Sequence, residues 1–226
     1  AWCWKESATA GFDIVSYTGN GTDDTDISHN LSAVPHLIIV KNLGANEDWN
    51  VYHHKNTSAP ETDFLELNDT DATADAADRW SDEVPTSSVF TIGDNSDVNQ
   101  DATGFVAYLF SEKQGYSKFG TYTGNGNADG TFVYTGFRPA MIIFKKSSAA
   151  GNNWGLFDNK RNTFNLVDTG LKPDANEAEY TTNGCDFLSN GVKMRSTGGD
   201  NNESGSNYIY MAFAEAPLVN SNGVPC

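Results

Sequence analysis

Three oxygen-bearing side chains follow one another at intervals of two residues in a polar stretch of the sequence. They are Asp97, Asn99 and Asp101. Carboxylate and amide oxygens are the ligands that Ca²⁺ takes, and this spacing opens an EF-hand loop. The EF-hand pattern then fails, because no glycine follows Asp101 and the twelfth position is Tyr108 instead of glutamate. The sequence therefore predicts a solvated turn, with a weak Ca²⁺ site on these three residues as the alternative, and no other cofactor.

A second candidate is the pair Arg79 and Trp80, which lies in the long acidic segment 55–88. Trp49 and Trp154 occupy matching places in the two halves of the chain beside apolar residues, which is typical of core packing. Trp80 has no such counterpart. An exposed tryptophan can stack on a sugar ring or anchor a protein interface. We therefore predict an exposed ligand-binding loop at Trp80 and Arg79.

The sequence carries no recognisable catalytic motif. The nucleophile elbow Gly-x-Ser-x-Gly, the zinc motif His-Glu-x-x-His and the Ser-x-x-Lys motif are all missing. His53 and His54 are adjacent, so on a strand they point to opposite faces and do not readily share one metal ion. Glu6, Glu112 and Glu215 recur at matching places, where a salt bridge or a protected strand edge explains them. We predict a non-catalytic protein, with a glycosidase carboxylate pair as the open alternative.

The elements that must position these residues belong to two copies of one unit. The string Tyr17–Gly21, Tyr-Thr-Gly-Asn-Gly, returns as Tyr122–Gly126. A self-similar period of about 100 residues has the size of a single domain. The predicted segments are residues 1–6 as the last strand of a preceding repeat in a longer polypeptide, 7–114 as repeat 1, 115–217 as repeat 2, and 218–226 as a C-terminal extension.

Short apolar runs separated by glycine, asparagine and aspartate predict an all-β fold. We expect two tandem antiparallel β-sandwich repeats of the jelly-roll-like kind, with a single merged sandwich as the alternative. The closing strand Phe105–Phe110 should pair with the next opening strand, Lys118–Thr123. The repeated Tyr-Thr-Gly-Asn-Gly reads as a strand end and a tight turn, since both Asn and Gly accept positive φ.

Charge and composition exclude several classes of partner. The net charge is −16, from 30 acidic and 14 basic residues, and such a protein repels nucleic acid phosphates. No apolar stretch approaches the roughly 20 residues of a membrane span, so we expect no membrane insertion. The three cysteines, Cys3, Cys185 and Cys226, form neither a disulfide framework nor a zinc spacing. Free thiols are consistent with assembly in a reducing cytoplasm.

Six strings of this sequence resemble a domain that recurs in phages. That domain occurs in virion structural and tail-fibre-like proteins of tailed phages, notably those infecting marine bacteria and cyanobacteria. The strings are Gly11–Phe12 with Tyr17–Gly21, Pro35 with Ile38–Lys41, Gly115–Phe119 with Tyr122–Gly126, Tyr134–Pro139, Phe187–Gly191 and Ala212–Glu215.

The resemblance implies a virion protein that is exposed on the particle and forms homo-oligomers, often trimers. Its expected partners are other virion proteins, copies of itself, and a host-surface glycan or protein. The expected place is a tail fibre or appendage that attaches to the host. The alternatives are a capsid decoration or fibre protein with a purely structural role, and a glycan-degrading tailspike enzyme. The resemblance carries no catalytic or binding residues onto this chain.

Overall fold

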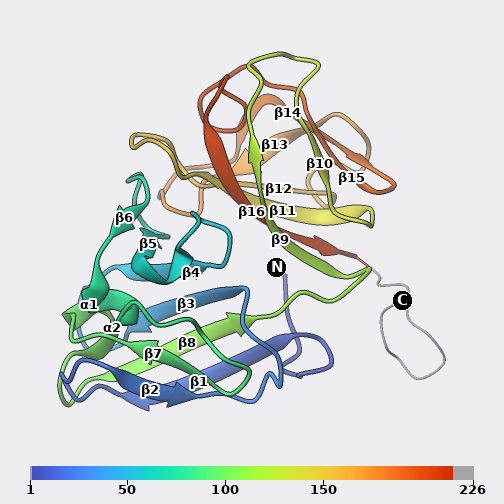
Figure 1. The fold of residues 1–226 in the computed structure, drawn as a ribbon. Coiled ribbons are helices and arrows are strands. Elements are labelled where there is room, and N and C mark those ends of the chain that lie inside the picture. Colours follow the sequence, from blue (N-terminus) through green and yellow to red (C-terminus); the bar gives the residue numbers. More distant parts are fainter. Residues whose placement is uncertain (1, 216–226) are drawn as a thin grey trace. The chain divides into compact units, whose positions relative to one another are not determined.

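The computed structural model describes residues 2–215, and these divide into two compact units (Figure 1). The first unit takes the chain up to Leu67 together with Thr73–Glu112. The second takes Asn68–Ala72 and the chain from Lys113 onward. This division lies close to the predicted boundary between residues 114 and 115. The predicted extension 218–226 lies outside the described residues.

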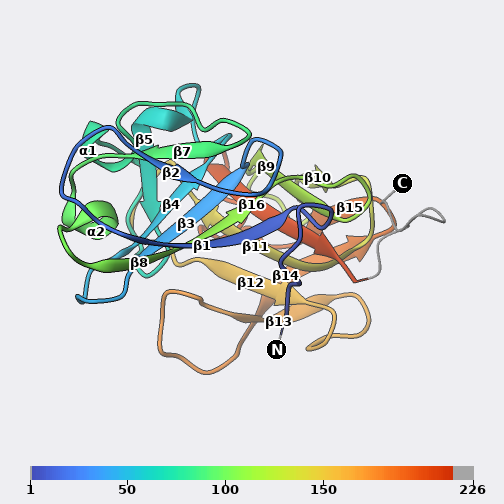
Figure 2. The ribbon, with the colours of Figure 1, turned by 90° about the horizontal axis from the view of Figure 1, so that it is seen from below.

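The first unit is built from antiparallel strands in two layers (Figures 1 and 2). A six-stranded sheet has the order β1-β8-β3-β4-β5-β6, and a separate sheet pairs β2 with β7. The strands are β1 (Phe12–Thr18), β2 (Thr25–Ser28), β3 (Leu37–Asn42), β4 (Trp49–His53), β5 (Asp63–Glu66), β6 (Ala74–Asp75), β7 (Val89–Ile92) and β8 (Gly104–Phe110).

Helices are few and short in this unit. They are the 3₁₀ turn η1 (Pro60–Thr62) and the single turns α1 (Ala77–Trp80) and α2 (Ser96–Asn99). Among residues 2–215, no helix has the length and apolar character needed to cross a bilayer.

The core of the first unit lies between its two sheets. Ile38 of β3 and Leu109 of β8 are fully buried and pack in one cluster with Ile27, Phe90 and Ile92 from the β2–β7 sheet. A continuous apolar run marks a strand that is covered on both faces. The central position of β3 and β8 in the sheet therefore follows from their sequences.

The second unit is one antiparallel sheet of eight strands, in the order β10-β15-β14-β13-β12-β11-β16-β9. β10 and β9 are the two edge strands of this sheet. The Thr131 hydroxyl, just before β10, donates a hydrogen bond of 2.7 Å to the carbonyl of Thr123 at the end of β9, which shows that the sheet curls and brings these edges together. The strands are β9 (Ser117–Thr123), β10 (Phe132–Tyr134), β11 (Pro139–Lys146), β12 (Gly155–Asp158), β13 (Val167–Leu171), β14 (Tyr180–Leu188), β15 (Gly191–Met194) and β16 (Asn207–Ala214).

One buried asparagine in each unit holds the repeated turn. In the first unit Asn99 is 0% exposed, and its amide donates to the Thr22 carbonyl at 2.8 Å and the Gly93 carbonyl at 2.9 Å. Its side-chain oxygen accepts from the backbone N–H of Asn20 at 2.9 Å. Gly21 adopts φ +62°, a conformation that glycine takes without strain. The predicted strand end and tight turn are therefore confirmed, and a residue about 80 positions away holds them.

Asn202 makes the same set of contacts in the second unit. Its amide donates to the carbonyls of Asn127 at 2.9 Å and Ser196 at 2.8 Å, and its oxygen accepts from the N–H of Asn125 at 3.1 Å. The turn glycine, Gly126, again has φ +64°. The two units thus share this arrangement atom for atom, which confirms the repeat at the level of structure.

Two details differ from expectation. The closing strand β8 pairs with β1 of its own unit, and β16 likewise pairs with β9, so the predicted hairpin between the units is wrong. Each closing strand therefore pairs within the sheet of its own unit. Residues 2–6 form no strand; the ring of Trp4 packs on Phe12 and Phe110 instead.

We expect Asn99→Ala to lower the free energy of unfolding of the first unit by about 2–4 kcal/mol, because it leaves the buried Gly93 carbonyl without this donor and removes the part-buried hydrogen bonds to the Thr22 carbonyl and the Asn20 N–H. Asn202→Ala should cost the second unit a similar amount. Denaturant titration of both variants measures these losses. The exposed Asn46 is the control, and Asn46→Ala should change stability by less than about 0.5 kcal/mol. Equal stability of all three variants would contradict the role of the buried amides.

Candidate functional site

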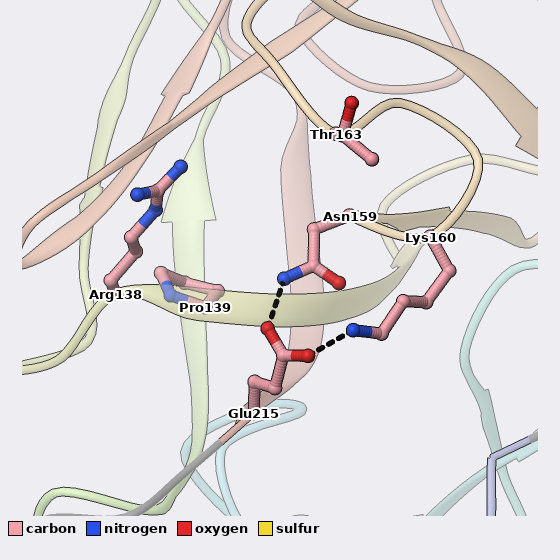
Figure 3. A pocket seen from close by; sticks show the side chains of 6 residues that line it. All are labelled: Arg138, Pro139, Asn159, Lys160, Thr163 and Glu215. Carbon is pink, nitrogen blue, oxygen red and sulfur yellow. Dashed lines mark hydrogen bonds and ion pairs between the residues drawn. The ribbon is translucent and has the colours of Figure 1, made fainter.

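A pocket of the second unit opens where three segments meet (Figure 3). It has a volume of about 470 Å³. Its lining comes from the start of β11, the loop that follows β12, and the residue that follows β16. The lining residues are Arg138, Pro139, Asn159, Lys160, Thr163 and Glu215.

The strand register brings these segments together. β11 lies between β12 and β16, with Met141 opposite Asp158 and Pro139 opposite Ala214. Both neighbouring strands therefore end beside the beginning of β11. The backbone N–H of Asn159 donates to the Ala140 carbonyl at 2.9 Å, which fixes the start of the loop against that strand.

Glu215 is held by two donors inside the pocket. One carboxylate oxygen pairs with the ammonium group of Lys160, and the other accepts from the Asn159 amide at 2.9 Å (Figure 3). These hydrogen bonds, that of Lys160 first, lower the pKa of Glu215 below its ordinary value of 4.5, and the charge of Arg138 adds to the effect. Glu215 is therefore ionised at neutral pH and oriented for hydrogen bonding.

The loop after β12 has a firm base and an exposed apolar tip. The buried Asp158 accepts from the backbone N–H groups of Lys160 and Arg161, both at 2.9 Å, and pairs with the Arg161 guanidinium. Farther along, Asn165 exchanges hydrogen bonds with the backbone of Phe187 on β14. Between these anchors Phe164, next in sequence to Thr163, is 82% exposed. The loop thus presents an exposed aromatic ring one residue after Thr163, which lines the pocket.

This set of groups suits binding better than catalysis. Arg138, Lys160 and Asn159 donate hydrogen bonds, and Glu215 accepts them. Glu215 is the one carboxylate of the lining, and its pKa is lowered instead of raised. A glycosidase needs two carboxyl groups, one of them kept protonated by a raised pKa. The pocket therefore lacks the pair that such an enzyme uses.

Trp80 lies in the core, so the prediction that it is exposed is wrong. It is 2% exposed, its indole N–H donates to the Asp63 carbonyl at 3.0 Å, and its ring meets Tyr52 edge-on at 6.1 Å. The single turn α1 directs it inward, into the core cluster of the first unit. A buried tryptophan that has satisfied its N–H is a packing residue.

Arg79 is likewise inside, and the prediction of an exposed ligand residue is wrong for it too. Its side chain is 11% exposed. The guanidinium donates to Asn50 at 2.8 Å, pairs with Asp78 at 2.9 Å and Asp97 at 3.0 Å, and lies 4.5 Å from the centroid of the Phe64 ring. A guanidinium group can pair with more than one carboxylate while it stacks on an aromatic face, and this suits arginine to buried sites. The Arg79 guanidinium therefore binds residues of its own unit.

Asp97, Asn99 and Asp101 have separate roles in the structure, which does not support the alternative prediction of a weak Ca²⁺ site on these residues. Asp97 and Asn99 lie on α2, where residues two apart point in different directions. Asp97 pairs with Arg79, Asn99 holds the repeated turn, and Asp101 is exposed. The EF-hand spacing brings side chains to one ion only in an open loop, and here Asp97 and Asn99 lie on the helical turn α2 instead.

Asp97 instead joins a carboxylate cluster that the sequence did not reveal. Carboxylate oxygens of Asp48, Glu66 and Asp97 lie within 4.8 Å of one another. A hydrogen bond between their neighbour Glu47 and Asp97 raises the pKa of Glu47 above its ordinary value of 4.5, and the charges of Asp97 and Asp48 act in the same direction. The four acids come from the loop before β4, from β5 and from α2. Because they are far apart in the sequence, no local spacing could have found them.

The cluster predicts a pH dependence of stability. A raised pKa means that the folded protein holds the Glu47 proton more tightly than the unfolded chain does. The protonated Glu47 carboxyl therefore stabilises the folded protein fully below about pH 4.5, and this contribution is lost as the pH rises through the raised pKa of Glu47. We expect Glu47→Gln to raise the melting temperature of the first unit at pH 7, with the difference shrinking toward pH 4. Calorimetry across this range tests it.

The exposed Glu83 is the matched control, and Glu83→Gln should show no such trend. A melting temperature of Glu47→Gln below that of the wild type at pH 7 would contradict the repulsion between these carboxylates.

Comparison with known proteins places the chain in a family. No curated protein and no solved structure matches it. The model of one family, described as a domain of unknown function, DUF7483, matches residues 1–217 and so spans both units. With the all-β repeat established and nearly the whole chain matched, the protein belongs to the DUF7483 family.

Proposed function

We propose that the chain is a non-catalytic virion protein of a tailed phage, serving as a module of a tail fibre or appendage that attaches to the host surface. The resemblance to virion domains motivates this proposal, and the tandem all-β units and the charge of −16 are consistent with an exposed particle component. The observation that carries the attachment role is the polar pocket at Glu215 with its exposed aromatic neighbour.

The pocket has the properties of a saccharide site. Its volume of about 470 Å³ falls within the range of small-molecule sites, roughly 300–1,000 Å³. Arg138, Asn159, Thr163 and Glu215 offer donors and acceptors to sugar hydroxyl groups. Phe164 offers a flat apolar face of the kind on which the C–H face of a sugar ring packs. A neutral or acidic host-surface glycan is therefore the proposed ligand.

The proposed ligand can be tested by binding of the purified chain to host-envelope polysaccharide and to a glycan array. We expect saturable binding that weakens at least tenfold in Arg138→Ala and in Phe164→Ala, because each removes one contact to the sugar. Tyr134 is a matched control, since it is also an exposed aromatic of the second unit, at 62%, and is not among the residues that line the pocket. Tyr134→Ala should bind as the wild type does.

Two results would overturn the proposal. Undetectable binding to the host polysaccharide together with tight association with other virion proteins would leave the purely structural role. Release of reducing sugar by the wild type, lost in Glu215→Gln, would establish the glycan-degrading alternative instead.

The proposed location can be tested on the intact particle. Cryo-electron microscopy should find this chain in a tail appendage as a homo-oligomer, with the Phe164 loop facing outward. Density on the capsid shell, with that loop covered by neighbouring subunits, would contradict an attachment role and identify a decoration protein.

A further inference from the structure

The second unit contains another, smaller cavity that the proposed function does not use. It has a volume of about 70 Å³. It lies between the start of β14 and the turn that follows β15. Its lining residues are Phe144, Tyr180, Thr182, Ser196, Gly198, Asp200 and Asn201.

The first unit shows what occupies the corresponding place. The asparagines Asn99 and Asn202 make matching contacts, and the carboxylates Asp97 and Asp200 each stand two residues before them. In the first unit the guanidinium of Arg79 binds Asp97 at 3.0 Å. The second unit therefore has a carboxylate at the position where the first unit binds a guanidinium group.

The neighbouring turn supports the same match. The carbonyls of Gly93 and Ser196 both accept from the buried asparagine amide of their unit. In the first unit the N–H of Gly93 donates to the Arg79 carbonyl at 3.0 Å, so α1 rests on this turn. In the second unit Ser196 lines the cavity. The cavity therefore lies against the surface that α1 covers in the first unit.

An aromatic ring is present in both places, although it comes from different strands. Phe64 lies beneath the Arg79 guanidinium, and the strand register matches it with Gly170. A Cβ atom on Gly170 would lie 3.0 Å from Cζ of Tyr180, so the Tyr180 ring fills the space of the missing side chain. The ammonium group of Lys172 lies 5.8 Å from the centroid of that ring, which is the attraction expected between a cation and an aromatic face.

Among the described residues of the second unit, no arginine lines this cavity. Residues 172–179, which join β13 to β14, contain no helix that corresponds to α1. Arg161 pairs with Asp158 and Glu179, and Arg195 pairs with Asp186 and Asp129. Of the nearby lysines, Lys172 pairs with Glu177, and Lys145 donates to the carbonyls of Thr70 and Asn152.

We infer that this cavity binds an alkylguanidinium group, such as an arginine side chain presented from outside the unit. The Asp200 carboxylate accepts its N–H donors, as Asp97 does for Arg79, and the Tyr180 ring forms part of the cavity wall beside it. An alkylguanidinium group joins a planar charge to a short apolar stem, which suits a cavity lined by one exposed acid, two aromatic rings and polar turn residues.

The test is a titration of the whole chain with ethylguanidinium, followed by the amide resonances of Gly198 and Asn201. We expect saturable shifts with a dissociation constant on the order of millimolar. Ethylurea has nearly the same shape without the charge, and it should produce no saturable shift. Asp200→Asn should weaken binding at least tenfold while keeping a side-chain oxygen for the Asn152 amide, which now donates to Asp200 at 3.1 Å. Asp97→Asn is the matched control in the first unit and should leave these shifts unchanged.

Two further variants keep the inference open to contradiction should Asp200→Asn fold poorly. Thr182→Leu should block the cavity and abolish the shifts. Arg79→Ala should create a second site in the first unit, seen as new ethylguanidinium-dependent shifts at Gly93 and Val98. N-acetylarginine amide, which carries the group as a protein does, should bind at least as well as free arginine if the natural ligand is a protein side chain. Shifts that ethylurea reproduces, or that persist unchanged in both Asp200→Asn and Thr182→Leu, would overturn the inference.

Discussion

The buried amides of Asn99 and Asn202 are the interactions on which each unit depends. A side-chain amide has both donors and an acceptor. One asparagine can therefore hydrogen-bond to backbone groups of the repeated turn and also to the carbonyl of Gly93 or Ser196, which precedes the asparagine in the sequence. Tyr17 and Tyr122 add the same support, since their hydroxyl groups donate to the carbonyls of Val98 and Asn201. An aspartate or a leucine at the asparagine position would leave buried carbonyls unpaired.

The contacts of Asn99 and Asn202 are the same in the two units. The units differ in the elements that surround these contacts. The first unit inserts α1, and Arg79 and Trp80 fill the space beside α2. The second unit uses that side for the long strand β14, which pairs with β13 and β15 and joins the curled sheet. The same framework thus yields a filled interior in one unit and a cavity in the other.

The two units also differ in the charged residues of the hairpin loop that follows their third strand. A lysine at the end of the third strand of each unit ties down the following hairpin loop: Lys41 donates to the Glu47 carbonyl at 2.7 Å, and Lys145 to the Asn152 carbonyl at 2.8 Å. Burial lowers the pKa of Lys145, although surrounding aspartates, Asp174 first among them, act against this. In the first unit acids stand in the place of the Asn152–Asn153 pair, and the carboxylate cluster with its raised Glu47 pKa is the result.

The sequence by itself determined the repeat, the all-β class, most of the strands and the tight turn at Tyr-Thr-Gly-Asn-Gly. These features depend on the two-residue period of strands and on residues that accept positive φ, and both are local properties. Only the tertiary structure decided that Trp80 and Arg79 are buried, that Asp97 and Asn99 point apart, and that Glu215 meets Lys160 in a pocket. Each of these outcomes depends on which distant strands pair and in which register, and a local pattern does not encode that choice.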